Sequence, residues 1–187
     1  MFISYQMIYA SFREPVGIFA NWFNHIAAKF TGGDYCHSEF IFEWTQQELT
    51  EVLQSAEIHG SSLNRIKSPD KIFIAVYVMW GMEVGYRVLT RDAQDPFWQM
   101  PNDHLVPVQC DAKQEKQLFA WCMDQMGKKY DKFGAMGCMV PVRSCQLEYD
   151  TYFCSQLMVC ALNHIHVMST NPGAASPNSL YSALTST

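Results

Sequence analysis

The chain has 187 residues, of which 49% are hydrophobic and 14% aromatic, and its formal net charge at pH 7 is −5. This length suits one domain with a substantial core, so we predict a single domain over residues 1–187. The composition excludes a disordered chain, and the scattered basic residues argue against nucleic acid as a partner.

The hydrophobic pattern predicts mostly strands in the first half of the chain. The segment "YCHSEFIFEW" alternates, which places His37 and Glu39 on one face of a strand and Phe40 and Phe42 on the other. We expect the face of Phe40, Phe42 and Trp44 to form core and the face of His37, Glu39, Ile41 and Glu43 to be more polar. The predicted strands are residues 2–11, 35–44, 51–58 and 70–80. Residues 16–33 are predicted to form a helix that ends at Gly32 and Gly33, with Ile18, Trp22, Phe23, Ile26 and Phe30 on one face.

Helices are predicted to dominate the second half of the chain. The polar, proline-bearing segment 91–107 is predicted to be loop, as is the segment from the end of the next helix to about Asp150. The predicted helix limits are Asp111 (N-cap) and Gly127, then Cys154 and His166, and finally Ser176 (N-cap) and Pro177 at the start of the last helix. Strands that cluster before the last helices favour an α+β fold with an antiparallel sheet.

Seven cysteines are present, but none of them forms a C-x-x-C pair, which argues against a zinc knuckle or a thioredoxin-type site. The first residues lack the basic and long apolar regions of a secretory signal, and no apolar run reaches membrane-spanning length. We therefore expect no integral membrane segment, and a reducing, cytoplasmic compartment in which most thiols are free.

Cys154 lies where the helical pattern of "YFCSQLMVCAL" begins. A helix N-terminus lowers the pKa of a thiol through its dipole and its free N–H groups, and the same groups can hold an oxyanion. This position favours a nucleophile. The alternative is a buried structural cysteine, which is the commoner fate of a cysteine beside leucines.

A cysteine nucleophile needs a base, and His37 is the best of six histidines. His37 begins a predicted strand and has Glu39 two residues later, on the same face, where a carboxylate can orient the imidazole. The alternative is a surface His–Glu pair at a strand end. The other histidines have loop, helix-end or apolar-helix surroundings: His25, His59, His104, His164 and His166.

Five segments in this order resemble one known group. They are "YCHSEFIFEW", "VLQSAEIHGSSLNRI", "GKKYDKFGAMG", "YFCSQLMVCAL" and "SPNSLYSAL". The chain resembles the circularly permuted branch of the NlpC-type papain-like cysteine hydrolases, which includes YiiX-like amidases and lecithin:retinol acyltransferase-like enzymes. In this branch the histidine strand precedes the cysteine helix, and the H-x-E form of the histidine strand resembles a viral and phage-like subgroup. The resemblance implies a permuted papain-like fold.

The resemblance also implies the roles of individual residues. Cys154 would be the nucleophile and His37 the general base, and no cofactor or metal would be needed. The residue that orients His37 stays open between Gln54, on the strand expected after the histidine strand, Glu39 and Glu57. Tyr152 or Tyr130 could add a donor to the oxyanion hole.

The implied reaction is acyl transfer through a thioester, on a peptide, amide or acyl-lipid substrate. We favour a soluble amidase or peptidase. The alternatives are an acyltransferase or a lipid or thioester hydrolase of the same fold, and a non-catalytic structural or virion-associated binding module. A cysteine-dependent phosphatase is set aside, because Cys138 and Arg143 have four residues between them where that chemistry requires five.

Overall fold

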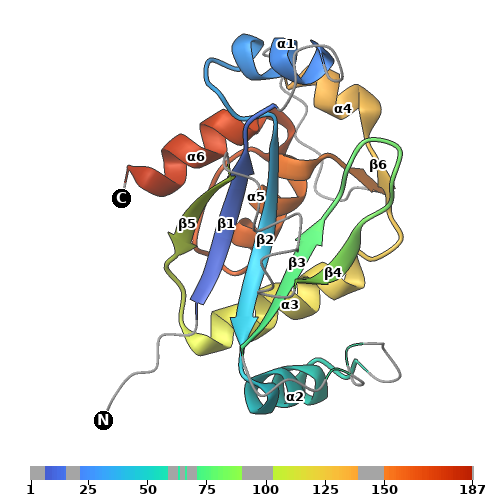
Figure 1. Ribbon diagram of the computed structural model, residues 1–187, viewed down its shortest axis with the longest axis vertical. Coiled ribbons are helices and arrows are strands. Elements are labelled where there is room, and N and C mark those ends of the chain that lie inside the picture. Colours follow the sequence, from blue (N-terminus) through green and yellow to red (C-terminus); the bar gives the residue numbers. More distant parts are fainter. Residues whose placement is uncertain are drawn as a thin grey trace.

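A five-stranded antiparallel sheet forms the centre of the computed structural model (Figure 1), which describes residues 7–15, 22–58, 63, 66, 71–89, 103–138 and 150–186. The strand order is β4-β3-β2-β1-β5, so β2 lies in the middle of the sheet. The strands are β1 (Met7–Arg13), β2 (His37–Trp44), β3 (Ile72–Tyr77), β4 (Gly85–Leu89) and β5 (Asp103–Val108). The predicted α+β class with an antiparallel sheet is confirmed.

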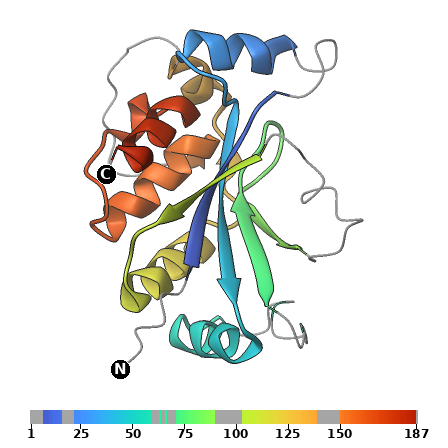
Figure 2. The ribbon, with the colours of Figure 1, turned by 60° about the vertical axis from the view of Figure 1, so that its left-hand side comes forward.

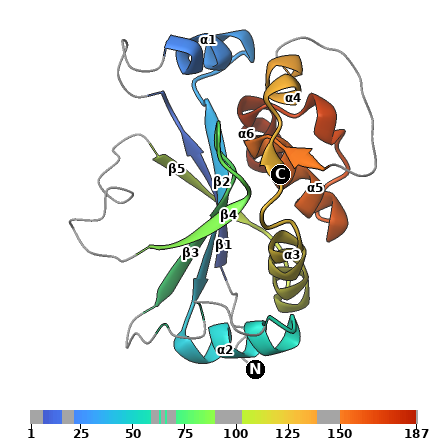
Figure 3. The same ribbon diagram turned by 90° about the vertical axis from the view of Figure 1, so that its right-hand side faces the viewer.

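Six helices of the described residues pack against this sheet. They are α1 (Trp22–Phe30), α2 (Gln46–Ser55), α3 (Ala112–Asp124), α4 (Lys132–Gly137), α5 (Cys154–His164) and α6 (Pro177–Thr185). Figure 3 shows α3, α5 and α6 on one side of the sheet, and Figure 2 shows α1 and α2 at its two opposite ends. A short parallel pair, β6 (Lys129–Tyr130) and β7 (Thr151–Tyr152), and a 3₁₀ turn, η2 (Pro172–Ala174), complete the described elements.

The alternation in β2 is confirmed. Phe40, Phe42 and Trp44 are fully buried in the main core, where the Phe42 ring lies 5.1 Å from that of Phe119 on α3. The opposite face was expected to be the more polar one, yet Ile41 is also fully buried there, in a second cluster with residues of β3 and β4. A central strand buried on both faces keeps its side chains in fixed positions, and this includes those that build the site.

The predicted strand over residues 51–58 is wrong, because most of this segment belongs to α2. Thr45 caps that helix: its Oγ1 accepts the N–H of Glu48, and the Glu48 carboxylate accepts the N–H of Thr45 in return. The buried face of the helix consists of Leu49, Val52 and Leu53. The T-x-x-E pair before helically spaced leucines was the signal for this helix, and it outweighs the short apolar run that suggested a strand.

The predicted loop over residues 91–107 is also wrong at its end. Residues 103–107 belong to β5, which pairs with β1 at the edge of the sheet and carries Pro107 opposite Tyr9. A proline is tolerated on an edge strand, where its missing N–H breaks no ladder. The strand β4 was not predicted, and α4 lies in a segment that was predicted to be loop.

The first predicted helix is confirmed over Trp22–Phe30 but not in its packing. Ile26 is 38% exposed and Phe30 is 73% exposed, so these members of the predicted apolar face do not enter the core. Ile18 and the rest of residues 16–21 lie outside the described residues, as do residues 2–6 of the first predicted strand.

The predicted helix caps in the second half are confirmed. Asp111 caps α3, and Ser176 caps α6 with Pro177 in the first turn. The end of α3 comes at Asp124, three residues before Gly127, whose φ of +82° a glycine adopts without strain.

Glu115 is a buried acid of the core, 1% exposed on α3. Its Oε1 accepts the indole N–H of Trp44 at 2.8 Å, whereas Oε2 has no hydrogen-bond partner among the described residues. Burial raises the pKa of its carboxyl to about 7, although the Trp44 hydrogen bond acts in the opposite direction. Because this pKa is raised, the folded state holds the proton, and the stability that this contributes is lost as the pH rises from 4.5 through about 7.

Glu115→Gln should therefore raise the melting temperature at pH 8 by roughly 3–6 °C and change it little at pH 5, because glutamine keeps the acceptor for Trp44 without a charge. Thermal unfolding at the two pH values measures this effect. Glu51→Gln, a substitution on the exposed face of α2, is the matched control. If Glu115→Gln instead melts at a lower temperature than the wild-type protein at pH 8, then Glu115 is ionised in the folded state.

Candidate active site

Cys154 is the first residue of α5, directly after the chain leaves β7. Phe153 is the N-cap in extended conformation, and its N–H donates to Gln156 Oε1 at 3.3 Å. The helix begins at the predicted position, and Cys154 is 6% exposed. The first N–H groups of a helix have no intrahelical acceptor, so the thiol lies at the positive end of α5.

His37 is the first residue of β2, and Figure 1 shows α5 behind this strand. The imidazole forms a hydrogen bond with the thiol of Cys154. Its Nε2 faces Glu39 Oε2 at 3.7 Å. The structure thus brings together two residues that are 117 positions apart in the sequence.

The surroundings of the two side chains favour a charged pair. Burial by itself would raise the pKa of Cys154, but the hydrogen bond and charge of His37 and the backbone N–H groups of Ser38 and Ser155 lower it. Burial by itself would lower the pKa of His37, but the interactions of the imidazole with Cys154 and Glu39 raise it to about 9. Near neutral pH this arrangement favours a thiolate beside an imidazolium, the reactive state of a cysteine nucleophile.

Glu39 lies behind His37 and is 1% exposed. Its Oε1 accepts a hydrogen bond from Arg87 of β4 at 2.7 Å, and Arg13 of β1 lies 3.6 Å from the same oxygen. Burial would raise the pKa of Glu39, but His37, Arg87 and Arg13 keep it below its ordinary value. His37 Nε2 and Glu39 Oε2 are both buried and have no hydrogen-bond partner among the described residues, so a small approach from 3.7 Å would join them.

The other two candidates for the orienting residue lie elsewhere. Gln54 is exposed on α2 and Glu57 follows the same helix, whereas His37 lies at the opposite end of β2 (Figure 1). An eight-residue strand spans about 26 Å, so neither side chain reaches the imidazole. The expectation for Gln54 depended on a strand that is in fact a helix. Of the three candidates, the structure brings Glu39 to His37.

The two candidate tyrosines differ in position. Tyr152 is buried and its hydroxyl donates to Gln125 Oε1 at 3.0 Å, so it serves the packing of α3. Tyr130 lines the cavity that contains Cys154. Burial, followed by the negative charges of Cys154 and Cys138, raises the pKa of Tyr130, so its phenol stays protonated and can donate.

Cys154 and His37 open into a cavity of about 760 Å³. Its walls come from the ends of β1 and β2, from α1 and α4, from β6 and from the turn between β3 and β4. A cavity of this size accommodates a small-molecule or peptide fragment next to the thiol.

No family model, no curated protein and no solved structure matches this chain. The site is therefore interpreted from its own geometry.

Asn178, the second residue of α6, holds the turn that leads into β2. Its Oδ1 accepts the N–H of Tyr35 at 2.9 Å, and its Nδ2 donates to Thr31 Oγ1 at 2.7 Å and to the carbonyl of Tyr35 at 3.1 Å. A side chain on Gly33 would collide with this amide. On the other side, Ser155 Oγ donates to the carbonyl of Ala175 at 2.8 Å. Ala175 and Asn178, just before and just inside the start of α6, thus connect the helix of Cys154 to the turn before the strand of His37.

Sequence reasoning missed Asn178, Arg13 and Arg87 as contributors to the site. Arg87 lies on β4, a strand that the pattern did not indicate, and Arg13 ends β1 next to β2. Their shared contact with Glu39 depends on the sheet order, for which the sequence held no signal.

The other thiols have a different environment. Burial raises the pKa of Cys110, Cys138 and Cys160 to about 12, and it also raises that of Cys122. No disulfide joins the six cysteines within the described part of the chain, and Cys145 lies outside it. At Cys154, by contrast, the pKa of the thiol is lowered and the thiol contacts an imidazole.

The described residues show neither a metal-binding cluster nor a membrane-spanning helix. Within residues 7–15, 22–58, 63, 66, 71–89, 103–138 and 150–186, no group of three or more His, Cys, Asp or Glu residues is placed to hold a metal ion. Among the helices of this same part of the chain, none is long and apolar enough to cross a membrane.

Proposed function

We propose that this protein is a thiol hydrolase, an amidase or peptidase that acts through Cys154 and His37. The observation that carries the proposal is the hydrogen-bonded Cys154–His37 pair at the N-terminus of α5, with a lowered pKa at the thiol and a raised one at the imidazole. The order of the two elements along the chain and the antiparallel sheet support membership in the permuted branch of the NlpC-type papain-like hydrolases.

In this proposal the thiolate attacks the carbonyl carbon of an amide. The carbonyl oxygen becomes an oxyanion next to the free N–H groups of the first turn of α5, and Tyr130 adds a donor from the cavity wall. The imidazolium of His37 then gives its proton to the leaving amine, and a thioester to Cys154 remains. Water, deprotonated by His37, hydrolyses the thioester and restores the thiolate.

Glu39 is the orienting residue in this scheme. As a carboxylate held by two arginines it stays ionised, so it stabilises the imidazolium and fixes which ring nitrogen faces the thiol. The free state of the six described cysteines supports a reducing, cytoplasmic environment as part of the proposal, with a virion as the alternative.

The first test compares the reactivity of the thiols. Iodoacetamide at pH 7 should modify Cys154 at least about 100-fold faster than Cys110, Cys138 or Cys160, because the fraction of thiolate is far larger at Cys154. Peptide mapping after short exposure measures the individual rates. Equal rates at these four cysteines would contradict an activated nucleophile.

The second test is a hydrolysis screen with peptide, isopeptide, lipid-ester and thioester substrates. Hydrolysis of an amide by the wild-type protein, lost in Cys154→Ala and kept in Cys160→Ala, would support the proposal. Cys160 is the matched control because it lies on the same helix, half-buried, six residues further on. Transfer to an acceptor or faster turnover of lipid esters would favour the acyltransferase alternative, and no turnover together with an unreactive Cys154 would favour a binding module.

A further inference from the structure

The cavity beside Cys154 has two sides of different chemistry. On the side of His37, the lining residues include Arg13, Glu14 and Asn24, from the end of β1 and from α1. Among the described residues that line the cavity, these are the charged or amide side chains apart from His37 and Cys154. The lining of the other side consists mainly of apolar and aromatic side chains of the β3–β4 turn, β6 and α4: Met79, Trp80, Met82, Tyr130 and Ala135. We call this second set the apolar wall.

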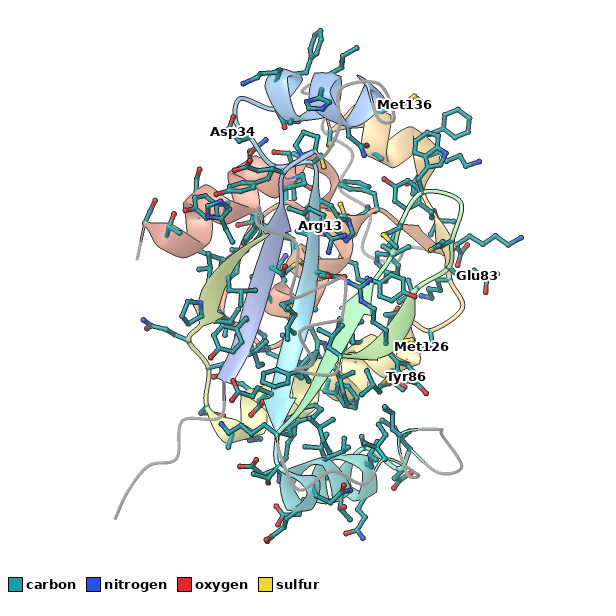
Figure 4. All side chains as sticks on the ribbon, in the orientation of Figure 1. Arg13, Asp34, Glu83, Tyr86, Met126 and Met136 are labelled. Carbon is teal, nitrogen blue, oxygen red and sulfur yellow. The ribbon has the colours of Figure 1, made fainter. Side chains whose placement is uncertain are left out.

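The apolar wall is open to solvent. Trp80 and Met82 are each 50% exposed, although both line the cavity. The Trp80 ring lies 5.6 Å from that of Tyr130, and Lys132 Nζ lies 5.5 Å from the Trp80 ring, so the indole is held from two directions. Large apolar side chains that stay exposed around a cavity mark a binding surface. Figure 4 shows Arg13 at the end of β1, and to its right the turn with Glu83 and the helix with Met136.

The chemistry of the site assigns a part of the substrate to each side. The leaving group must lie next to His37, because the imidazolium protonates it. The acyl group stays bound to the sulfur of Cys154 and therefore extends away from His37. Tyr130 lies close enough to Cys154 for the charge of the thiolate to raise the pKa of its phenol, after burial, so the apolar wall begins next to the nucleophile.

We propose that the apolar wall binds the acyl part of the substrate, and that this part carries a compact apolar side chain, aromatic or branched aliphatic. The inference rests on the proposed function and specifies its substrate class. Such a side chain would cover Trp80 and Met82 and remove their surface from water. The described residues of this wall include no cation that could bind an acidic side chain. Lys132 lies against the Trp80 ring but does not line the cavity.

The test uses coumarin amides of N-acetylated phenylalanine, leucine, glycine and glutamate. We expect kcat/KM to be at least about tenfold higher for phenylalanine and leucine than for glycine and glutamate. Trp80→Ala should lower kcat/KM for the phenylalanine substrate by about tenfold and that for glycine by less than about twofold. Trp80→Phe should restore most of the preference. Val88→Ala is the matched control, since Val88 is 39% exposed on β4 and does not line the cavity.

A second measurement does not need turnover. Chloromethyl ketones of N-acetyl-phenylalanine and N-acetyl-glycine alkylate an activated thiol, and the first should label Cys154 faster in the wild-type protein but not in Trp80→Ala. Three results would overturn the proposed substrate class without contradicting the role of Cys154. They are an equal loss of kcat/KM for all four amides in Trp80→Ala, a preference of the wild-type protein for glutamate, and a higher rate with a palmitoyl ester. If neither ketone labels Cys154 and no amide is hydrolysed, the proposed function itself fails, and this inference fails with it.

Discussion

His37→Ala should lower kcat/KM for an amide substrate by about 10⁴-fold or more, because it removes both the proton donor for the leaving group and the partner that keeps the thiol ionised. The same substitution should raise the pKa of Cys154, so that iodoacetamide modifies it much more slowly at pH 7 than in the wild-type protein. The rate of alkylation, measured against pH, gives this pKa directly. His164→Ala is the matched control, since His164 is exposed at the far end of α5.

The pH dependence of the wild-type protein separates the two roles of His37. Because its pKa is about 9, kcat/KM should fall as the pH rises through about 9, where the imidazolium loses its proton. Alkylation of Cys154 should not fall there, because the thiolate persists. The raised pKa also contributes stability that is complete below about 6.5 and is lost as the pH rises through about 9. Parallel loss of alkylation and hydrolysis above pH 9 would contradict the assigned roles.

Glu39→Gln should lower kcat by about 10²- to 10⁴-fold and move the alkaline limit of kcat/KM below pH 9. The first effect follows from the lost orientation of His37, and the second from the lost negative charge that helps to raise the pKa of His37. The substitution should also destabilise the fold by about 2 kcal/mol, since Arg13 and Arg87 would face an uncharged group. The pH profile of kcat/KM and a denaturant titration measure the two consequences separately.

Glu43→Gln is the matched control for this prediction. Glu43 lies on the same strand and the same face, four residues further on, and is paired with Lys71 at 2.6 Å, far from His37. It should lose some stability without any change in the pH limit of kcat/KM. If Glu39→Gln loses stability but keeps its alkaline limit near pH 9, then Glu39 supports the sheet and does not orient the imidazole.

The sequence predicted the parts of the fold that depend on short-range pattern. The alternation of β2, the caps Asp111 and Ser176 and the start of α5 at Cys154 are all encoded within a few residues. The pattern was misleading in two places. For α2 a short apolar run suggested a strand although a capping box precedes it, and for β5 the presence of Pro107 suggested a loop. A local signal existed for α2, whereas the strand character of β5 depends on its pairing with β1 at the edge of the sheet.

The same distinction between local and long-range features applies to the candidate site. The sequence indicated Cys154 and His37 as candidates, because a helix N-terminus and the start of a strand are local features, but it left the orienting residue open between Gln54, Glu39 and Glu57. The positions of Arg87 on β4 and of Asn178 on α6 were not predictable, because each acts across elements that are distant in sequence.

By itself, the sequence indicated the candidate residues: Cys154 where a helix can begin, His37 where a strand begins, and Gln54, Glu39 or Glu57 as the residue that orients the imidazole. The tertiary structure alone decided that the thiol and the imidazole meet, that Glu39 and not Gln54 stands behind them, and that an apolar wall lies beside the thiol. The physical reason is that strand order and helix packing set these distances. Both result from burial of the whole core, to which residues far apart in the chain contribute at once.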